Sequence, residues 1–339
     1  MTDPVASARP RFTSQLPGLL PRLVVAAGLT GYLLWKAHPR AVAEAAVGAD
    51  WRLIAIAVAL VLVDRSLMAY RWLALLCTVD RDRRPPFSAL MRVFFVSTFV
   101  GTFLPMSVGS DAVRSYSLTR FNVGGGEAVA SVLMDRMLGV ASILLMALVG
   151  LSLVRELATN TGVLVAMAVA AVACVVTIAL IFSERAAEFA VGLVSRLPGA
   201  TIRHAGSRVL ESVRRYSAYP GPLVNVLACS LGVQTLRVVQ AYYIGRGLGM
   251  DVPLVTYFAF IPIILLIMLL PVTFNGIGTA QAAFVWLFAR TGTPDAVSFA
   301  LSVLFVALGI VGNLPGGILY LIGGISGPRV GAELAPPSK

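Results

Sequence analysis

Seven ionisable residues fall within or beside strongly apolar segments of this 339-residue chain: Asp64, Arg65, Asp111, Arg114, Asp135, Arg136 and Arg237. A charged side chain facing lipid costs roughly 3 kcal/mol on insertion scales, so these residues should converge on one another or on water. Neighbouring side chains on a helix point about 100° apart. We therefore predict that neither Asp64 with Arg65 nor Asp135 with Arg136 forms a self-contained ion pair, and that each charge has a partner on another segment.

The three acids and four arginines leave one positive charge over, which a buried anion could neutralise. The planar guanidinium group suits phosphate because it can donate two parallel hydrogen bonds. Arg65, Arg114, Arg136 and Arg237 are therefore candidate ligands of an anionic group. The acids Asp64, Asp111 and Asp135 would orient these arginines or carry protons. The alternative is a charge network that only fixes helix packing.

Two apolar runs are interrupted by proline and glycine, at FLPMSVGSDAVR (103–114) and at LLPVTFNGIGTAQAAF (269–284). Proline removes a backbone donor and glycine permits a tight reversal, so both segments predict helix breaks at membrane depth. Free backbone N–H groups and polar side chains at such breaks can bind anions. The candidates are Ser107, Gly109, Thr273, Asn275 and Gln281, and the alternative role of the polar side chains is to cap the helix ends.

The elements that must position these residues are membrane helices. Hydrophobic residues make up 58% of the chain and charged residues only 13%, which excludes soluble globular and disordered proteins. The apolar runs lie at 19–35, 53–77, 88–104, 129–154, 161–182, 222–244, 254–274, 277–290 and 296–325. The first has no cleavage site followed by a soluble domain, so we expect a membrane helix there and not a signal peptide. The sequence predicts an all-α polytopic membrane protein.

Charge distribution favours two re-entrant hairpins at the breaks and six full spans. This arrangement places 15 loop cations on the side of the N-terminus and 6 on the other side, as the positive-inside rule requires. Both termini would then be cytoplasmic. Residues 19–160 and 161–325 would each contain span, span, hairpin and span in opposite orientations, which is an inverted repeat. RSLMAY (65–70) and RVVQAY (237–242) occupy matching positions in the two halves.

The expected organisation is a cytoplasmic tail (1–18), a single membrane domain (19–325) and a C-terminal tail (326–339). Within it, residues 183–221 form a polar connection, which we interpret as an interfacial helix on anionic lipid, with a solvated loop as the alternative. Trp35, Trp51 and Trp72 lie near predicted membrane interfaces and are interpreted as aromatic anchors. We expect a kink at Asn313 in the last run, not a third polar site.

Other function classes find little support. The three cysteines and two histidines have no metal-ligand or disulfide spacing, so no metal and no cofactor is expected. The net charge of +11 is better explained by anionic lipid than by nucleic acid, because the loops are too short for a nucleic-acid-binding domain. The oligomeric state is left open, with a homodimer as one option.

The motifs FLPMSVGSDAVRSYSLTR, ASVLMDRMLGV, LLPVTFNGIGTAQAAFVWL and LPGGILYL occur in this order. In this order they resemble the membrane-domain family of bacterial lysylphosphatidylglycerol synthases, also known as flippase-like integral membrane proteins. The resemblance covers roughly residues 50 to 325. Typical members contain P-G-x-V-G-G-D-x-x-R, S-x-L-x-D-R-x-x-G and N-G-x-G-x-R-E-A. The resemblance places these family positions on Pro105, Gly109, Asp111, Arg114, Asp135, Arg136, Asn275, Gly276 and Gly278.

The chain also departs from the family pattern. Met106 and Ser110 replace usual glycines, and Ala280 and Gln281 replace a usual Arg-Glu pair, so the substrate could differ from that of the best-known members. In those members the resemblance implies movement of aminoacylated phosphatidylglycerol between leaflets, while a separate soluble domain synthesises it. We expect no synthase activity here, since no such soluble domain follows the last apolar run.

The sequence therefore favours a lipid translocase of the bacterial inner membrane. Its substrate would be a phospholipid or a polyprenyl-phosphate-type lipid with an anionic or phosphate-containing head group. One alternative is a membrane-embedded transferase acting on a lipid-linked substrate. The other is a non-transporting scaffold for lipid or glycan synthesis.

Overall fold

The computed structural model describes residues 47–79, 87–102, 108–119, 125–153, 161–183, 218–269 and 276–323, with isolated residues elsewhere. The predicted first span, the centres of both breaks and most of the polar connection at 183–221 lie outside the described residues. Throughout the described ranges the regular structure is helical. The helices are α3 (Trp51–Val79), α4 (Phe87–Thr102), α5 (Val108–Thr119), α6 (Gly125–Leu153), α7 (Thr161–Phe182), α10 (Pro220–Gly247), α11 (Leu254–Leu269), α12 (Thr279–Phe288), η4 (Ala289–Thr291), α13 (Asp295–Val311) and α14 (Leu314–Gly323).

The described helices fall into two groups by length. Within the described residues, four helical stretches are long and apolar enough to cross a bilayer: Trp51–Cys77, Glu127–Leu153, Pro220–Gly247 and Asp295–Ile322. The 16 residues of α4 and of α11 extend only about 24 Å, which is less than the roughly 30 Å hydrocarbon core. Each packs against the short helix that follows it, α5 or α12. The all-α polytopic fold is confirmed, whereas the two re-entrant hairpins stay a prediction.

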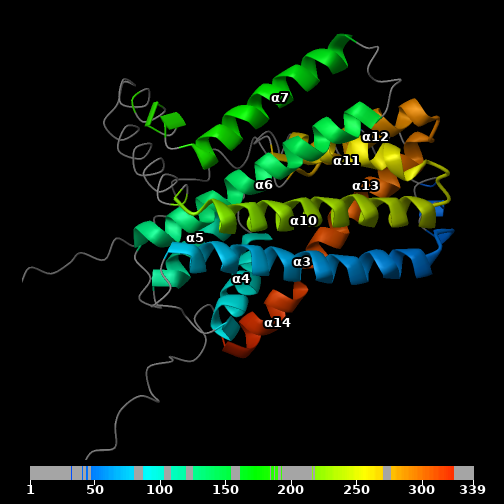
Figure 1. The fold of residues 1–339 in the computed structure, drawn as a ribbon. Helices are drawn as coiled ribbons and strands as arrows, with labels where there is room; N and C mark the ends of the chain where they lie inside the picture. The colour runs from blue at the N-terminus through cyan, green and yellow to red at the C-terminus, as the bar shows by residue number, and fades with distance from the viewer. Residues whose placement is uncertain are drawn as a thin grey trace, which may run out of the picture.

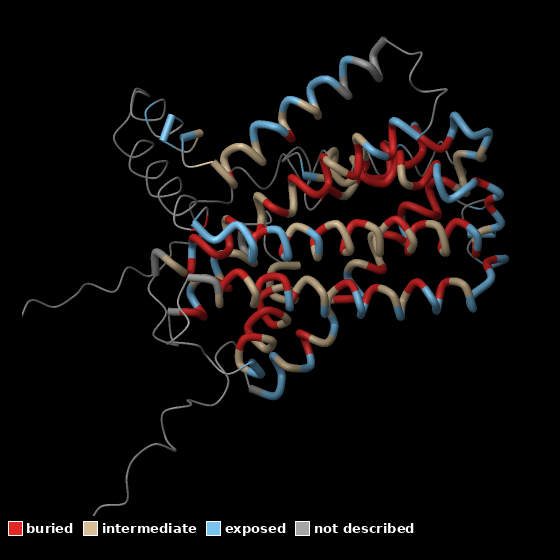
Figure 2. The backbone as a smooth tube through the Cα atoms, viewed as in Figure 1, coloured by how far each residue is buried: buried red, intermediate tan, exposed pale blue. Residues whose placement is uncertain are grey.

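Helices α3 and α10 form the centre of the molecule and run antiparallel side by side (Figure 1). The backbone N–H of Asp50, just before α3, donates to the carbonyl of Gly247 at the end of α10 at 2.7 Å. In Figure 2 the buried parts of α3, α6 and α10 form the interior, whereas α7 lies at the outside and is largely exposed. Exposed valines of α7 are what a lipid-facing helix presents.

The contacts between helices repeat in the two halves of the chain. Helix α3 corresponds to α10, α4 to α11, α5 to α12, and α6 to α13 with α14. Helix α6 packs on α11, and α14 correspondingly packs on α4. Helix α5 packs on α6, and α12 on α13. Each half thus places its last span against the first hairpin helix of the other half, which is the pairing that an inverted repeat predicts.

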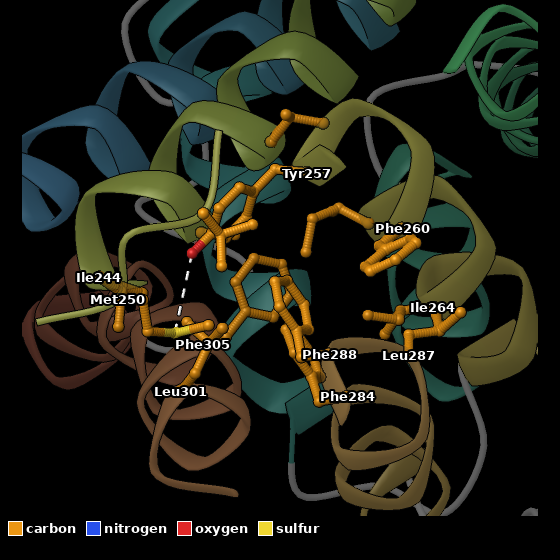
Figure 3. Packing of buried hydrophobic residues seen from close by; sticks show 14 of the residues in the cluster. Ile244, Met250, Tyr257, Phe260, Ile264, Phe284, Leu287, Phe288, Leu301 and Phe305 are labelled. Atoms are coloured by element: carbon orange, nitrogen blue, oxygen red, sulfur yellow. Dashed lines mark hydrogen bonds between the residues drawn. The ribbon is translucent and has the colours of Figure 1, made fainter. Parts of the chain in front are cut away.

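The second half contains a tightly packed aromatic core (Figure 3). Its members come from α11, α12 and α13 and include Tyr257, Phe260, Phe284, Phe288 and Phe305. The ring centroids of Tyr257 and Phe288 are 5.1 Å apart, and those of Phe260 and Phe288 are 5.3 Å apart in an edge arrangement. Such pairs add to the burial of apolar area. This core holds the second hairpin against α13.

The last apolar run is interrupted where α13 ends at Val311 and α14 begins at Leu314. Pro315 cannot donate a backbone hydrogen bond, and the Asn313 side-chain amide donates to Thr102 Oγ1 on α4 at 2.8 Å. A break is therefore present as expected, but Asn313 also lines the central cavity described below. The break brings the Asn313 amide to the end of α4, so this position also contributes a polar group to the cavity.

Two glycines allow the close packing between the halves. A Cβ atom added at Gly150 of α6 would overlap the carbonyl of Phe258 on α11. A Cβ added at Gly316 of α14 would overlap the carbonyl of Phe95 on α4. Small residues permit such backbone approach between membrane helices. The two glycines occupy equivalent contacts in the two halves.

Replacing either glycine with alanine should therefore destabilise the protein. For Gly150→Ala and Gly316→Ala we expect a loss of about 1–3 kcal/mol, the usual cost of overpacking. Chemical unfolding in detergent measures the loss. The matched control is Gly221→Ala in α10, where an added Cβ meets nothing within 4 Å and stability should be unchanged or higher. Equal effects at all three positions would contradict the close-approach explanation.

Candidate anion-binding cavity

A cavity of about 460 Å³ lies where the two halves meet, between α3, α4, α5, α6, α10, α11 and α13. The end of α4 and the end of α11 both reach it, so each hairpin contributes a tip. The charged lining residues are Asp64, Arg65, Arg71, Arg114, Asp135, Arg136 and Arg237. Uncharged polar side chains also line it, from Thr98, Thr102, Ser110, Gln234, Gln240 and Asn313.

Much of the remaining lining is apolar. Helices α11 and α13 supply Leu265, Met268, Leu269, Phe305, Val306 and Ile310. The charged residues instead come mainly from α3, α5 and α6. The cavity lining is therefore amphipathic, because it combines charged and apolar side chains.

Asp135 on α6 is shared between two arginines. Its Oδ1 accepts a hydrogen bond from Arg71 Nε at 2.7 Å, and its Oδ2 lies 3.7 Å from Arg114 Nη1. Arg71 also donates to Ser230 Oγ on α10 at 3.2 Å. All three charged side chains are almost fully buried. Arg71 therefore forms the close ion pair, while Arg114 lies beyond hydrogen-bond distance of the carboxylate.

Arg114 is held in place by aromatic rings. Its guanidinium carbon lies 5.0 Å from the ring centroid of Trp72 and 4.7 Å from that of Phe94. Cation–π contacts orient a guanidinium group without neutralising its charge. Trp72 is completely buried in this arrangement. The expectation that Trp72 is an interfacial anchor was wrong, because its position on α3 faces the interior beside α4.

Asp111 on α5 and Arg136 on α6 form a further ion pair. Arg136 donates from Nε to Asp111 Oδ2 at 2.9 Å and from Nη2 to Oδ1 at 3.1 Å. This is a bidentate pair, the strongest geometry for these two groups. The prediction that Asp135 and Arg136 find partners on other segments, and not each other, is thus confirmed.

Asp64 contacts both arginines of the repeated sequence RSLMAY and RVVQAY. Its Oδ2 lies 2.9 Å from Arg65 Nη1, and its Oδ1 lies 3.6 Å from Arg237 Nε. Both arginines also approach the sulfur of Met68, at 3.3 and 3.4 Å. The two sequence echoes therefore meet at the centre of the molecule, one from α3 and one from α10.

Asp64 does contact its neighbour Arg65, but the pair is not self-contained, as predicted, because Asp64 also contacts Arg237 on α10. The angular argument holds for Cβ directions, but the long arginine side chain turns back to its neighbour. Arg65 also donates from Nη2 to the carbonyl of Gly309 on α13 at 3.1 Å. A partner on another segment is therefore present as well.

The membrane region of the chain matches a known protein family. A family model described as "Lysylphosphatidylglycerol synthase TM region" matches residues 19–316. The chain belongs to this family. It is a multi-pass membrane protein with a lipid-related role, as the family and its apolar helices indicate. No curated protein matches the chain.

Several family positions fall in the charge cluster. Asp111, Arg114, Asp135 and Arg136 from the first two family motifs all take part in its ion pairs. In the third motif, Gly276 and Gly278 have φ angles of 74° and 90° in the turn before α12. Such positive φ values are accessible to glycine but are strained for other residues. The family glycines there have a backbone role.

The remaining predicted ligands are less central. Gln281, expected to complete the pocket, does not line the cavity: its Oε1 accepts a hydrogen bond from the backbone N–H of Gly278 at 2.5 Å. It is a helix cap, which was the alternative role. Gly109 lies in the first turn of α5. Ser107, Thr273 and Asn275 lie outside the described residues.

Sequence analysis missed Arg71, although its spacing offered a signal. Asp64, Met68 and Arg71 are separated by four and three residues, so they share one face of α3. All three line the cavity. With Arg71 included, the cluster contains five arginines and three aspartates, and the excess positive charge is two. Within the described ranges, no group of three or more His, Cys, Asp or Glu side chains converges as metal ligands would.

Proposed function

We propose that this protein moves a lipid with an anionic, phosphate-containing head group across the bacterial inner membrane. The observation that carries the proposal is the composition of the central cavity, where five lining arginines exceed by two the three aspartates that pair with them, and where α11 and α13 supply a largely apolar lining. A buried excess of positive charge is costly unless an anion neutralises it. A phosphorylated head group would neutralise the excess arginine charge, and its attached chain would contact the apolar lining residues.

The two halves of the molecule suggest how such a lipid would cross. In inverted repeats, the site lies between the halves and is exposed in turn to either side of the membrane. Here the tips of α4 and α11 both line the cavity, and each is covered by the last span of the other half. Alternating movement of the two hairpins would open the cavity to one leaflet and then to the other. Both termini would lie in the cytoplasm.

A leaflet-exchange assay tests this function. The purified protein is reconstituted in liposomes with fluorescent phosphatidylglycerol or fluorescent polyprenyl phosphate, and loss of fluorescence on adding an external quencher reports the exposed leaflet. We expect protein-dependent exchange of at least one of the two lipids, well above that of protein-free liposomes. Exchange no faster than in protein-free liposomes for both lipids would contradict the proposal.

The same liposomes distinguish the alternatives. Lipids extracted after the assay should be chemically unchanged, because the proposed protein moves its substrate without reacting with it. A new head group would instead indicate a membrane-embedded transferase. Neither exchange nor a new product would favour the scaffold role.

A further inference from the structure

The three aspartates of the cluster lie close to some of the five arginines and farther from the others. Asp111 forms a bidentate pair with Arg136, with hydrogen bonds of 2.9 and 3.1 Å. Asp135 forms its short contact with Arg71 at 2.7 Å. Asp64 forms its short contact with Arg65 at 2.9 Å. Each carboxylate therefore has one close arginine partner.

Two arginines remain with only distant carboxylates. Arg114 Nη1 lies 3.7 Å from Asp135, and Arg237 Nε lies 3.6 Å from Asp64. Both distances exceed those of charge-assisted hydrogen bonds. Arg114 side-chain exposure is 7% and that of Arg237 is 21%, so solvent compensates neither charge well.

The hydrogen-bond and ring partners of these two arginines are uncharged, but other charges lie near them: Asp111 attracts Arg114, and Arg71 and Arg136 repel both arginines. Arg114 lies over the rings of Trp72 and Phe94, and its Nε has no hydrogen-bond partner among the described residues. Arg237 donates to Gln234 Oε1 and approaches Met68 Sδ, both at 3.4 Å. Gln234 is itself oriented by its amide, which donates to Ser142 Oγ at 3.2 Å.

Among the described residues that line the cavity, Asp64 and Asp135 are the only acids. The segments 103–107 (FLPMS) and 270–275 (LPVTFN), which follow the cavity-lining ends of α4 and α11, contain neither aspartate nor glutamate. The two excess positive charges therefore belong to one cavity and come from different halves, Arg114 from α5 and Arg237 from α10.

We propose that this cavity selects lipids whose head group is a phosphate monoester with two negative charges, over singly charged phosphodiesters and over head groups that carry an added positive charge. The inference rests on the proposed function, because it concerns the substrate of the same site. Its reason is charge balance: one dianion neutralises both Arg114 and Arg237, whereas a monoanion leaves one of them buried and uncompensated. Phosphatidic acid and a polyprenyl phosphate share this chemistry and differ in the attached chain.

Binding measured in detergent tests the selectivity without requiring transport. Farnesyl phosphate is compared with its monomethyl ester, and dioctanoyl phosphatidic acid with dioctanoyl phosphatidylglycerol, at about pH 7.5, where a phosphate monoester is mostly doubly charged since its second pKa is about 6. Within each pair the chain is the same and esterification removes one charge. Native mass spectrometry or calorimetry provides the dissociation constants.

We expect the monoester to bind about tenfold or more tightly than its diester in at least one pair, as the loss of one charge-assisted contact implies. The pair with tighter binding identifies the preferred chain. Equal dissociation constants within both pairs would overturn the proposal. This comparison uses only the unmodified protein, so it does not depend on whether a variant folds.

Variants then assign the selectivity to the two arginines. Arg114→Gln and Arg237→Gln should each reduce the preference for the monoester to about threefold or less, since one excess charge is gone. The matched control is Arg246→Gln, which removes an exposed arginine outside the cavity that pairs with Asp251 and should keep the full preference. An unchanged preference in both cavity variants would overturn the assignment.

The outcomes for selectivity and for transport are separable. Leaflet exchange with no preference for monoesters would leave the translocase standing and overturn the charge selectivity. Preferential monoester binding without exchange of any phosphate lipid would support the selectivity and overturn the translocase.

Discussion

Replacing Arg114 with glutamine should abolish lipid exchange while leaving the protein folded. Arg114 lines the cavity, is almost fully buried and has its nearest carboxylate oxygen at 3.7 Å. Glutamine can still lie against Trp72 and Phe94 but carries no charge. Loss of a charge-assisted contact to a buried phosphate lowers affinity at least about tenfold. The expected result is exchange close to that of protein-free liposomes.

The fold should tolerate this change because Asp135 keeps its short contact with Arg71 at 2.7 Å. Thermal unfolding in detergent should therefore give a Tm close to that of the unmodified protein. Arg246→Gln serves as the matched control and should retain exchange, since Arg246 is an exposed residue outside the cavity. Full exchange by a folded Arg114→Gln variant would remove Arg114 from the site.

Replacing Asp135 with alanine should have the largest effect on stability. Asp135 is 5% exposed. It forms ion pairs with both Arg71, at 2.7 Å, and Arg114, at 3.7 Å. Its loss leaves two buried guanidinium groups without that charge. Breaking a buried ion pair from one side costs about 3–5 kcal/mol, because the remaining charge is uncompensated. We expect a loss of this size in the free energy of unfolding, with little protein recovered from the membrane.

Two comparisons show whether the charge or the side-chain volume is responsible. The exposed Asp251, paired with Arg246 at 2.7 Å, provides the matched control, and Asp251→Ala should change stability by less than about 1 kcal/mol. The double variant Arg71→Met with Asp135→Leu removes both charges of the close pair and should recover part of the stability lost in Asp135→Ala. A single Asp135→Ala variant as stable as Asp251→Ala would contradict the role given to this carboxylate.

Local features of the sequence were sufficient to predict the class of fold. Span length, the two Leu-Pro breaks and the arginine distribution each depend on short stretches of chain, and the helices α4, α11 and α12 end or begin near the predicted breaks. The echo of RSLMAY in RVVQAY also predicted a relation between α3 and α10. Such local features predict the fold class because a bilayer requires helical spans and sets their length.

Partner choice within the site could not be predicted in the same way. The energetic argument that intramembrane charges must converge is independent of geometry, and it identified residues of the cluster such as Asp111 and Arg136. It could not say that Asp64 contacts its own neighbour Arg65, since a flexible arginine side chain can reach several partners. Gln281 carries the right chemistry for the cavity, yet the turn at Gly278 uses it as a cap.

The sequence by itself determined an all-helical membrane protein of this family, with two broken helix pairs and a set of charges that lipid cannot solvate. Only the tertiary structure decided which arginines remain without a close carboxylate. That outcome depends on the packing of α3 against α10 and of α5 against α6. Asp64 and Arg237, for example, are 173 residues apart in the sequence and form an ion pair. Arg71 and Trp72 acquire their roles from the same approach, because helix packing sets which face of α3 meets the cavity.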